Sequence, residues 1–175
     1  HLLCNNAGVG PAGPMLQTTP TEWRWTFDVN VLGVAHGITT FAPRMVEAGV
    51  GHIVNVASQA GVMTTALLGM YCASKHAVVG LSEALYRELD TTPVGVSCLC
   101  PELVRTEIFD VARLRPHWVD VHETTDANQA VLGEILDHRG IEPSEVAVRV
   151  VDAVRTGRFW VFTHDVTMDM AMARF

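Results

Sequence analysis

The chain has 175 residues, of which 49% are hydrophobic and 18% charged, and its formal net charge is -7. This length fits a single domain, 1–175, with a buried core, and the acidic balance without a basic stripe argues against nucleic acid as a partner. No apolar run approaches the ~18 residues of a membrane span, and the opening residues lack the charged region of a signal peptide. We therefore expect a compact globular protein that binds neither nucleic acid nor membrane.

Cysteine and histidine usage indicates no metal centre. The cysteines form no CxxC pair and stand at Cys4, Cys72, Cys98 and Cys100. We expect them to be reduced, buried thiols, which favours a cytoplasmic location. His117 and His122 lack the spacing of a zinc motif, so we expect no metal site.

Short apolar runs bounded by glycine, proline or polar residues predict four strands. They are Leu2–Asn5, His52–Ala57, Val94–Cys100 and Phe159–Thr163. Most of the runs are continuous rather than alternating, which is typical of parallel strands covered on both faces. We interpret the first run as the end of a buried strand and expect that residues upstream of it are missing from the sequence.

Three helical segments are predicted between the strands. Thr19-Pro20-Thr21-Glu22 is a capping box with proline at the first helical position, and it opens a stretch that runs, continuously or with a break, to about Glu47. The other helices cover roughly Met70–Leu89 and Pro143–Arg155. This alternation predicts an α/β fold with a doubly wound parallel sheet of Rossmann-like type. Ligands of such sheets bind at the carboxyl ends of the strands.

Residues 105–140 form the least regular stretch of the chain, with Pro116 and many charged residues. Long connections of this kind are often mobile binding loops. The stretch is therefore either a mobile substrate loop or a loosely packed insertion.

The most informative pair is Tyr71 and Lys75. Lys75 is the only lysine, since the other eleven basic residues are arginines, and it follows one of only two tyrosines by four positions. On a helix, residues at this spacing share one face. A cation beside a phenol lowers its pKa, which suits a general acid/base that works near neutral pH. The alternative is an ordinary pair on a helix surface.

Small or polar residues follow the predicted strands. Asn5-Asn6-Ala7-Gly8 follows the first strand and either lets a ligand approach the backbone or forms an ordinary turn. Ser58 follows the second strand and either donates into a cleft or is solvated. Pro101 ends the third strand. Asn30 lies inside a helical stretch, where asparagine is unfavourable and can distort the helix, unless it is simply a buried structural residue.

Together these residues resemble the short-chain dehydrogenase/reductase family. The matching elements occur in order: Asn-Asn-Ala-Gly at 5–8, Asn30, Ser58, Tyr-x-x-x-Lys at 71–75, and Pro101 with Val104 and Thr106. Ser58 and Tyr71 are thirteen positions apart, as is typical of this family. The resemblance covers residues 5–106 and weakens beyond them.

The resemblance implies an oxidoreductase that transfers hydride between NAD or NADP and a small-molecule alcohol or carbonyl compound. Tyr71 would be the general acid/base, and Lys75 would lower its pKa and hold the nicotinamide ribose. Ser58 would place the substrate oxygen, and Asn30 would hold a water that links Lys75 to solvent.

Further contacts are implied in the same way. The remaining cofactor contacts would come from Asn5, Ala7, Gly8, Pro101, Val104 and Thr106. Gln59 and Glu102 would join Ser58 at the substrate. Helices near 24–47 and 70–89 would pair across a two-fold axis, so a homodimer or homotetramer is expected.

Two departures from the family pattern leave alternatives open. Glu102 stands where the family usually has glycine, and no Gly-rich phosphate-binding turn precedes Asn5, so the chain corresponds to the C-terminal portion of the fold. A truncated or degenerate member that acts as a binding or scaffold domain without catalysis is one alternative. A sugar-nucleotide epimerase or dehydratase is another, which the Asn-Asn-Ala-Gly run disfavours.

The substrate is indicated only by apolar side chains near the motifs. They form a pocket wall for a hydrophobic alcohol or ketone, or else belong to the core: Met63, Leu67, Leu68, Phe109 and Trp118.

Overall fold

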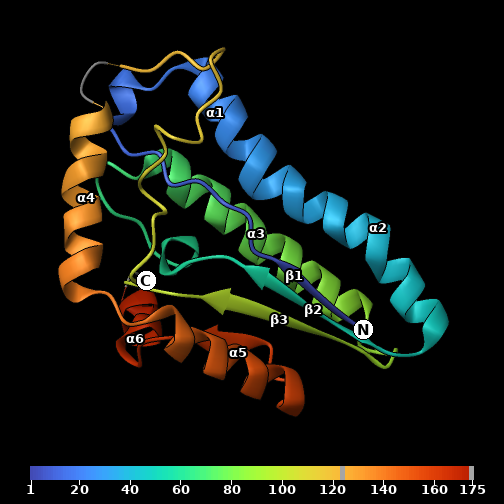
Figure 1. Ribbon diagram of the computed structural model, residues 1–175. Helices are drawn as coiled ribbons and strands as arrows, with labels where there is room; N and C mark the ends of the chain where they lie inside the picture. The colour runs from blue at the N-terminus through green and yellow to red at the C-terminus, as the bar shows by residue number, and fades with distance from the viewer. Residues whose placement is uncertain (123–124, 174–175) are drawn as a thin grey trace.

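The computed structural model describes residues 1–122 and 125–173, with main chain only at 125 and 126, and contains one parallel sheet (Figure 1). The strand order is β1-β2-β3-β4, and all three pairings are parallel. The strands are β1 (Leu2–Asn5), β2 (Gly51–Val56), β3 (Val94–Cys100) and β4 (Trp160–Phe162). All four predicted strands are confirmed, although β4 is shorter than its apolar run.

Helices cover both faces of the sheet, as predicted for a doubly wound fold. The helices are α1 (Pro20–Phe27), the π-helical segment η2 (Asp28–Leu32), α2 (Gly33–Ala48), α3 (Gly69–Glu88) and α5 (Pro143–Thr156). Figure 1 shows α2 and α3 on one face of the sheet and α5 on the other. The predicted α/β fold class is confirmed.

Local sequence signals explain where these helices begin, break and end. The Thr19 hydroxyl accepts from the Glu22 amide at 3.1 Å, and the Glu22 carboxylate accepts from the Thr19 amide at 2.9 Å, which completes the predicted capping box. The first helical stretch breaks into a π-helical segment around Asn30. It ends at Gly49, whose φ of 64° is readily reached by glycine.

Alternation along β2 divides the core into two layers. Ile53 packs among residues of α2 and α3, while Val54 packs against α5 with Leu99 and Val161. Both side chains are almost fully buried. Because successive side chains of a strand point to opposite faces, this register also decides which side chains can reach a site on the α5 side of the sheet.

The strand β1 lies at one edge of the sheet, and the prediction that it is a buried strand is wrong. Leu2 is 55% exposed, and Cys4 is an exposed thiol, whereas the other three cysteines are buried as expected. The edge position is the physical reason, because β1 pairs only with β2 in the part of the chain that the structure describes.

The stretch 105–140 is more regular than the sequence indicates. It contains α4 (Thr125–Arg139), whose helical pattern is weakened by Gly133 and by polar residues. Three short elements were also not predicted: η1 (Met15–Gln17), η3 (Gln59–Gly61) and α6 (Val166–Met172). Segments of seven residues or fewer carry too little periodicity to be recognised.

Arg105 joins the two ends of this stretch. Its amide donates to the Ile141 carbonyl at 2.9 Å, and its guanidinium donates to the carbonyls of Asp137 and Gly140, each at 3.2 Å. The guanidinium also pairs with the Glu142 carboxylate. The segment that follows β3 and the end of α4 are therefore held together.

Candidate active site

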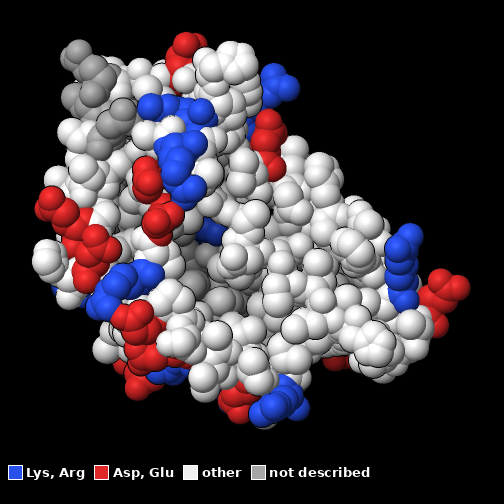
Figure 2. Space-filling model, in the orientation of Figure 1, with Lys and Arg blue, Asp and Glu red and all other residues white. Residues whose placement is uncertain are grey.

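A cavity of about 810 Å³ opens at the carboxyl ends of the strands. Most of the predicted site residues line it: Ala7, Gly8, Ser58, Gln59, Tyr71, Lys75, Pro101, Glu102, Val104 and Thr106. Figure 2 shows that charged side chains gather over α4, α6 and the segment after β3, while the surface over β1 and α2 is mostly uncharged. The strand register thus brings together residues that lie up to a hundred positions apart in sequence.

Tyr71 and Ser58 meet at one wall of this cavity. Tyr71 lies in the first turns of α3, and Ser58 follows β2 as the N-cap of η3, where its hydroxyl accepts from the Ala60 amide at 3.1 Å. Burial raises the pKa of Tyr71 to about 12, and a hydrogen bond with Ser58 acts in the lowering direction. This net direction is opposite to the one expected from the Tyr71–Lys75 pair alone, because desolvation of the phenolate dominates.

Lys75 lies one turn further along α3 and is buried. Its ammonium nitrogen donates to the Val56 carbonyl at 2.9 Å and lies 5.6 Å from the centroid of the Tyr71 ring. Burial lowers its pKa to about 8. A lysine in this state still carries its proton at neutral pH but gives it up more easily than one in water.

Asn30 does not line the cavity but lies directly behind it. Its side-chain oxygen accepts from the Val9 amide at 2.8 Å, and its side-chain nitrogen donates to the Val9 carbonyl at 2.9 Å. A methyl group at Gly8 would come within 3.4 Å of the Asn30 side-chain oxygen and 3.5 Å of the Lys75 nitrogen. The close approach of Asn30, Gly8 and Lys75 agrees with a shared site.

Ser74 is a member of this network that sequence reasoning missed. Its hydroxyl donates to the Tyr71 carbonyl at 2.8 Å and accepts from the Asn30 side-chain nitrogen at 3.0 Å. It thereby ties the Asn30 amide to the turn of α3 that carries Tyr71. Its position between Tyr71 and Lys75 was the only feature of the sequence that could have indicated its role.

Asn5, which was expected to line the cofactor cleft with Ala7 and Gly8, does not belong to the cavity lining. Its side-chain nitrogen donates to the Asn55 side-chain oxygen at 2.8 Å, and the Asn55 side-chain nitrogen donates to the Ser82 hydroxyl at 3.1 Å. A methyl group at Gly37 would lie 2.1 Å from the Asn5 side-chain oxygen. The alternation of β1 is the reason, since Leu2, Cys4 and Asn6 line the cavity while Asn5 faces α2.

The expected apolar wall is present in part. Met63, Leu68 and Phe109 line the cavity, and the Phe109 ring meets the Tyr71 ring edge-on with centroids 6.4 Å apart. Leu67 and Trp118 are 42% and 43% exposed and do not belong to the lining. Valines of α5, including Val146 and Val150, add an apolar surface on the opposite side.

The residues at this cavity fit a dinucleotide cofactor better than a metal ion. Gly8 leaves the backbone after β1 open to close approach, and the cavity has the volume of a ligand site. Within residues 1–122 and 125–173, no three histidine, cysteine, aspartate or glutamate side chains cluster as a metal site would need.

Among the helices described, none is long and apolar enough to cross a membrane.

Comparisons with known proteins agree with this geometry. The family model of the short chain dehydrogenase matches residues 1–116. A C alpha-dehydrogenase of Sphingobium sp. (strain NBRC 103272 / SYK-6) is 35% identical over 166 residues, which make up 93% of this chain and 54% of that protein.

Two solved structures extend the comparison to the fold. A short chain dehydrogenase/reductase from Burkholderia phymatum in complex with NAD has a TM-score of 0.93 at 39% identity, and the match covers 99% of this chain and 64% of that one. The apo form of LigO from Sphingobium sp. strain SYK-6 has a TM-score of 0.76 at 37% identity, over 99% of this chain and 56% of that one.

The chain spans between half and two thirds of the length of these relatives. The matched residues 1–116 include β1, β2 and β3 and the cavity residues Ser58, Tyr71 and Lys75. With the family model matching about two thirds of the sequence, the chain belongs to the short-chain dehydrogenase family.

Proposed function

We propose that this protein is an NAD- or NADP-dependent oxidoreductase that transfers hydride between the nicotinamide and an alcohol or ketone. The observation that carries the proposal is the meeting of Ser58, Tyr71 and Lys75 at one cavity wall. The relative solved in complex with NAD, which is 39% identical, supports the choice of cofactor class.

Each of these side chains has a distinct task in the proposed reaction. The hydroxyls of Ser58 and Tyr71 hold the substrate oxygen, and Tyr71 exchanges a proton with it. Lys75, protonated at neutral pH, stabilises the phenolate that forms when Tyr71 donates its proton. When bound, the nicotinamide cofactor supplies or accepts the hydride at the substrate carbon.

The residues that hold the cofactor follow β1 and β3. Ala7 and Gly8 offer backbone that a ligand can approach closely, and Pro101, Val104 and Thr106 line the same cavity beyond β3. Lys75 would hold the nicotinamide ribose. The side chains of Asn5 and Asn30 support this wall from behind rather than touching the ligand.

We infer that the free edge of β1 is covered by further polypeptide in the active protein. Leu2 and Cys4, both exposed, line the cavity at that edge. An unpaired parallel edge with apolar side chains is unfavourable in water and is normally covered.

Replacement of Tyr71 tests the function directly. We expect Tyr71→Phe to turn over a panel of secondary alcohols more slowly than the unaltered protein, by a factor on the order of 10²–10⁴. Turnover is measured through the absorbance of the nicotinamide. Binding of NAD or NADP, measured by titration of intrinsic fluorescence, should persist. Tyr86→Phe is the matched control, because Tyr86 is the other tyrosine and is 42% exposed.

Two results would contradict the proposal. Retained turnover in Tyr71→Phe would remove the role of the phenol. Failure of the unaltered protein to bind NAD or NADP would instead favour the non-catalytic binding or scaffold domain.

We also propose that the protein assembles as a homodimer or homotetramer through α2 and α3. An exposed aromatic side chain on α2 supports this, since Phe41 is 43% exposed. Sedimentation equilibrium of the unaltered protein would distinguish these assemblies from a monomer.

A further inference from the structure

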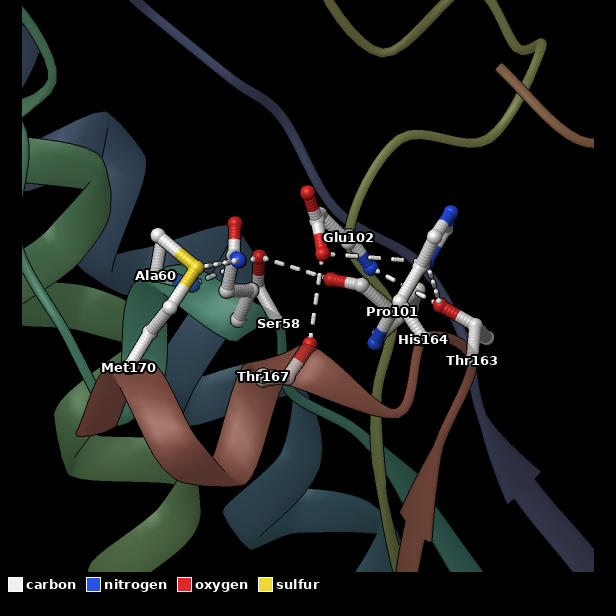
Figure 3. Close-up of polar contacts among 9 residues, drawn as sticks. Ser58, Ala60, Pro101, Glu102, Thr163, His164, Thr167 and Met170 are labelled. Carbon is white, nitrogen blue, oxygen red and sulfur yellow. Dashed lines mark hydrogen bonds and ion pairs between the residues drawn. The ribbon is translucent and has the colours of Figure 1, made fainter. Parts of the chain in front are cut away.

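The segment that follows β4 folds back onto the carboxyl end of β3. The Glu102 amide donates to the Thr163 hydroxyl at 3.0 Å, and the Thr163 hydroxyl lies 2.9 Å from Nδ1 of His164. Thr163 is 3% exposed. Figure 3 shows these residues beside Pro101 and Ser58, with α6 continuing below them.

The Glu102 carboxylate makes a second attachment to the same segment. Its Oε2 atom accepts from the Thr167 hydroxyl at 3.3 Å and lies 3.8 Å from Nδ1 of His164 (Figure 3). Thr167 belongs to α6 and is fully buried. A glycine at position 102 would keep the hydrogen bond from its backbone amide to the Thr163 hydroxyl, but it would have no side chain to bind Thr167 of α6. The carboxylate is therefore the part of the residue that joins β3 to α6.

This attachment places α6 beside the proposed substrate position. Sδ of Met170 lies 4.0 Å from the side-chain nitrogen Nε2 of Gln59. The backbone amide of Gln59 donates to the Pro101 carbonyl at 2.7 Å. Gln59 and Glu102 both line the cavity. Met170 is 45% exposed, and its flexible thioether lies beside Gln59, which belongs to the cavity lining. Figure 3 shows Met170 on the same side of the site as Ser58.

We propose that Glu102 is a positioning residue that fastens α6 to the end of β3, so that Met170 forms part of the substrate wall and favours substrates with a bulky apolar substituent. This proposal rests on the proposed function of the cavity. A methionine side chain adapts its shape to irregular apolar groups and makes favourable contacts with aromatic rings. Loss of the attachment removes that contact while leaving Ser58, Tyr71 and Lys75 in place.

Amide hydrogen exchange tests the attachment without any need for turnover. In Glu102→Gly and Thr167→Val, we expect exchange in residues 166–172 to accelerate roughly tenfold, because one polar contact of α6 is lost. Glu102→Gln keeps an acceptor for Thr167 and should restore most of the protection. Glu47→Gln, an exposed change on α2, is the control. Unchanged exchange of α6 in Glu102→Gly would overturn the attachment.

Steady-state kinetics test the consequence for the substrate. We compare oxidation of 1-phenylethanol, which has a bulky apolar substituent, with oxidation of 2-propanol, which has none. In Glu102→Gly and in Met170→Ala, we expect the rise in KM to be roughly tenfold larger for 1-phenylethanol than for 2-propanol. The effect on kcat should be similar for the two alcohols, and Glu102→Gln should recover most of the difference. Equal effects on both alcohols would overturn the role of α6 in substrate choice.

The two experiments separate the failure of one proposal from the failure of the other. If the unaltered protein turns over no alcohol, the proposed function fails, and the proposed role in substrate choice fails with it. The exchange of α6 then still decides whether Glu102 attaches this helix.

Discussion

The side chain of Asn30 binds the backbone of Val9 in both directions, accepting from its amide at 2.8 Å and donating to its carbonyl at 2.9 Å. The loop that follows β1 is thereby fastened to the π-helical segment at the start of α2. Since Val9 directly follows Gly8, this contact sets the position of the backbone that faces Lys75.

Removal of the Asn30–Val9 contact is expected to lower the free energy of unfolding. Asn30→Ala leaves two buried backbone groups of Val9 without their partner, so the free energy of unfolding should fall by about 3 kcal/mol. Denaturant unfolding followed by circular dichroism measures this change. Asp28→Asn, in the same helical segment but with an exposed ion pair to Arg24, should change stability by less than about 0.5 kcal/mol. Equal effects of the two changes would contradict the role of the Asn30–Val9 contact.

Two glycines on long helices should respond in opposite directions to alanine. At Gly37 of α2 the new methyl group would lie 2.1 Å from the Asn5 side-chain oxygen, so Gly37→Ala should destabilise the protein by about 1–3 kcal/mol. At Gly80 of α3, within the described residues, no atom outside the surrounding helix backbone lies within 4 Å of the new methyl group. Gly80→Ala should therefore stabilise the protein by up to ~1 kcal/mol. Thermal unfolding of both variants measures whether each change raises or lowers the stability of the protein. A stabilising Gly37→Ala would show that Asn5 does not press against α2.

The buried Lys75 predicts a rise of stability at alkaline pH. Its pKa is about 8 in the folded protein and 10.5 in its ordinary state. A lowered pKa contributes stability that is present above the unfolded value and is lost as pH falls through the folded value. Relative to Lys75→Met, the unfolding free energy of the unaltered protein should therefore increase between pH ~8 and ~10.5, by on the order of 3 kcal/mol.

Chemical denaturation at a series of pH values measures this difference. Lys75→Arg, which keeps its charge throughout this range, should show no such rise. Parallel stability curves for the unaltered protein and Lys75→Met would contradict the prediction.

His52 predicts a loss of stability at the acidic end. Burial lowers its pKa from 6.5, and its Nε2 atom lies 2.8 Å from the Ser97 hydroxyl, which itself donates to the Arg158 carbonyl. With a lowered folded pKa, the stability present above pH 6.5 is lost as pH falls through the folded value. The unfolding free energy of the unaltered protein should therefore decline more steeply below pH ~6.5 than that of His52→Gln.

The exposed His138 provides the control for this titration. His138→Gln should leave the acidic decline unchanged. If His52→Gln declines as steeply as the unaltered protein, burial of the imidazole does not govern stability in this range.

Local sequence patterns were sufficient for the four strands and for the helices that cover the sheet, but not for α4, α6 and the two short 3-10 segments. Continuous apolar runs identified the four strands, and the Thr19 capping box and Gly49 marked the ends of the first helical stretch. Tyr71 and Lys75 stood out because they are one helix turn apart, whereas Ser58 was recognised only through the resemblance to the family. Short-range geometry of this kind is encoded by neighbouring residues.

The sequence by itself determined the order of the four strands and of the helices that cover the sheet, and the identity of the residues at the carboxyl ends of the strands. Only the tertiary structure decided which face each residue occupies. Asn5 faces α2 because of the register of β1, and Tyr71 has a raised pKa because packing removes its water. The contact of Glu102 with Thr167 likewise joins residues 65 positions apart. Burial and long-range pairing depend on how separate elements pack, which no local pattern specifies.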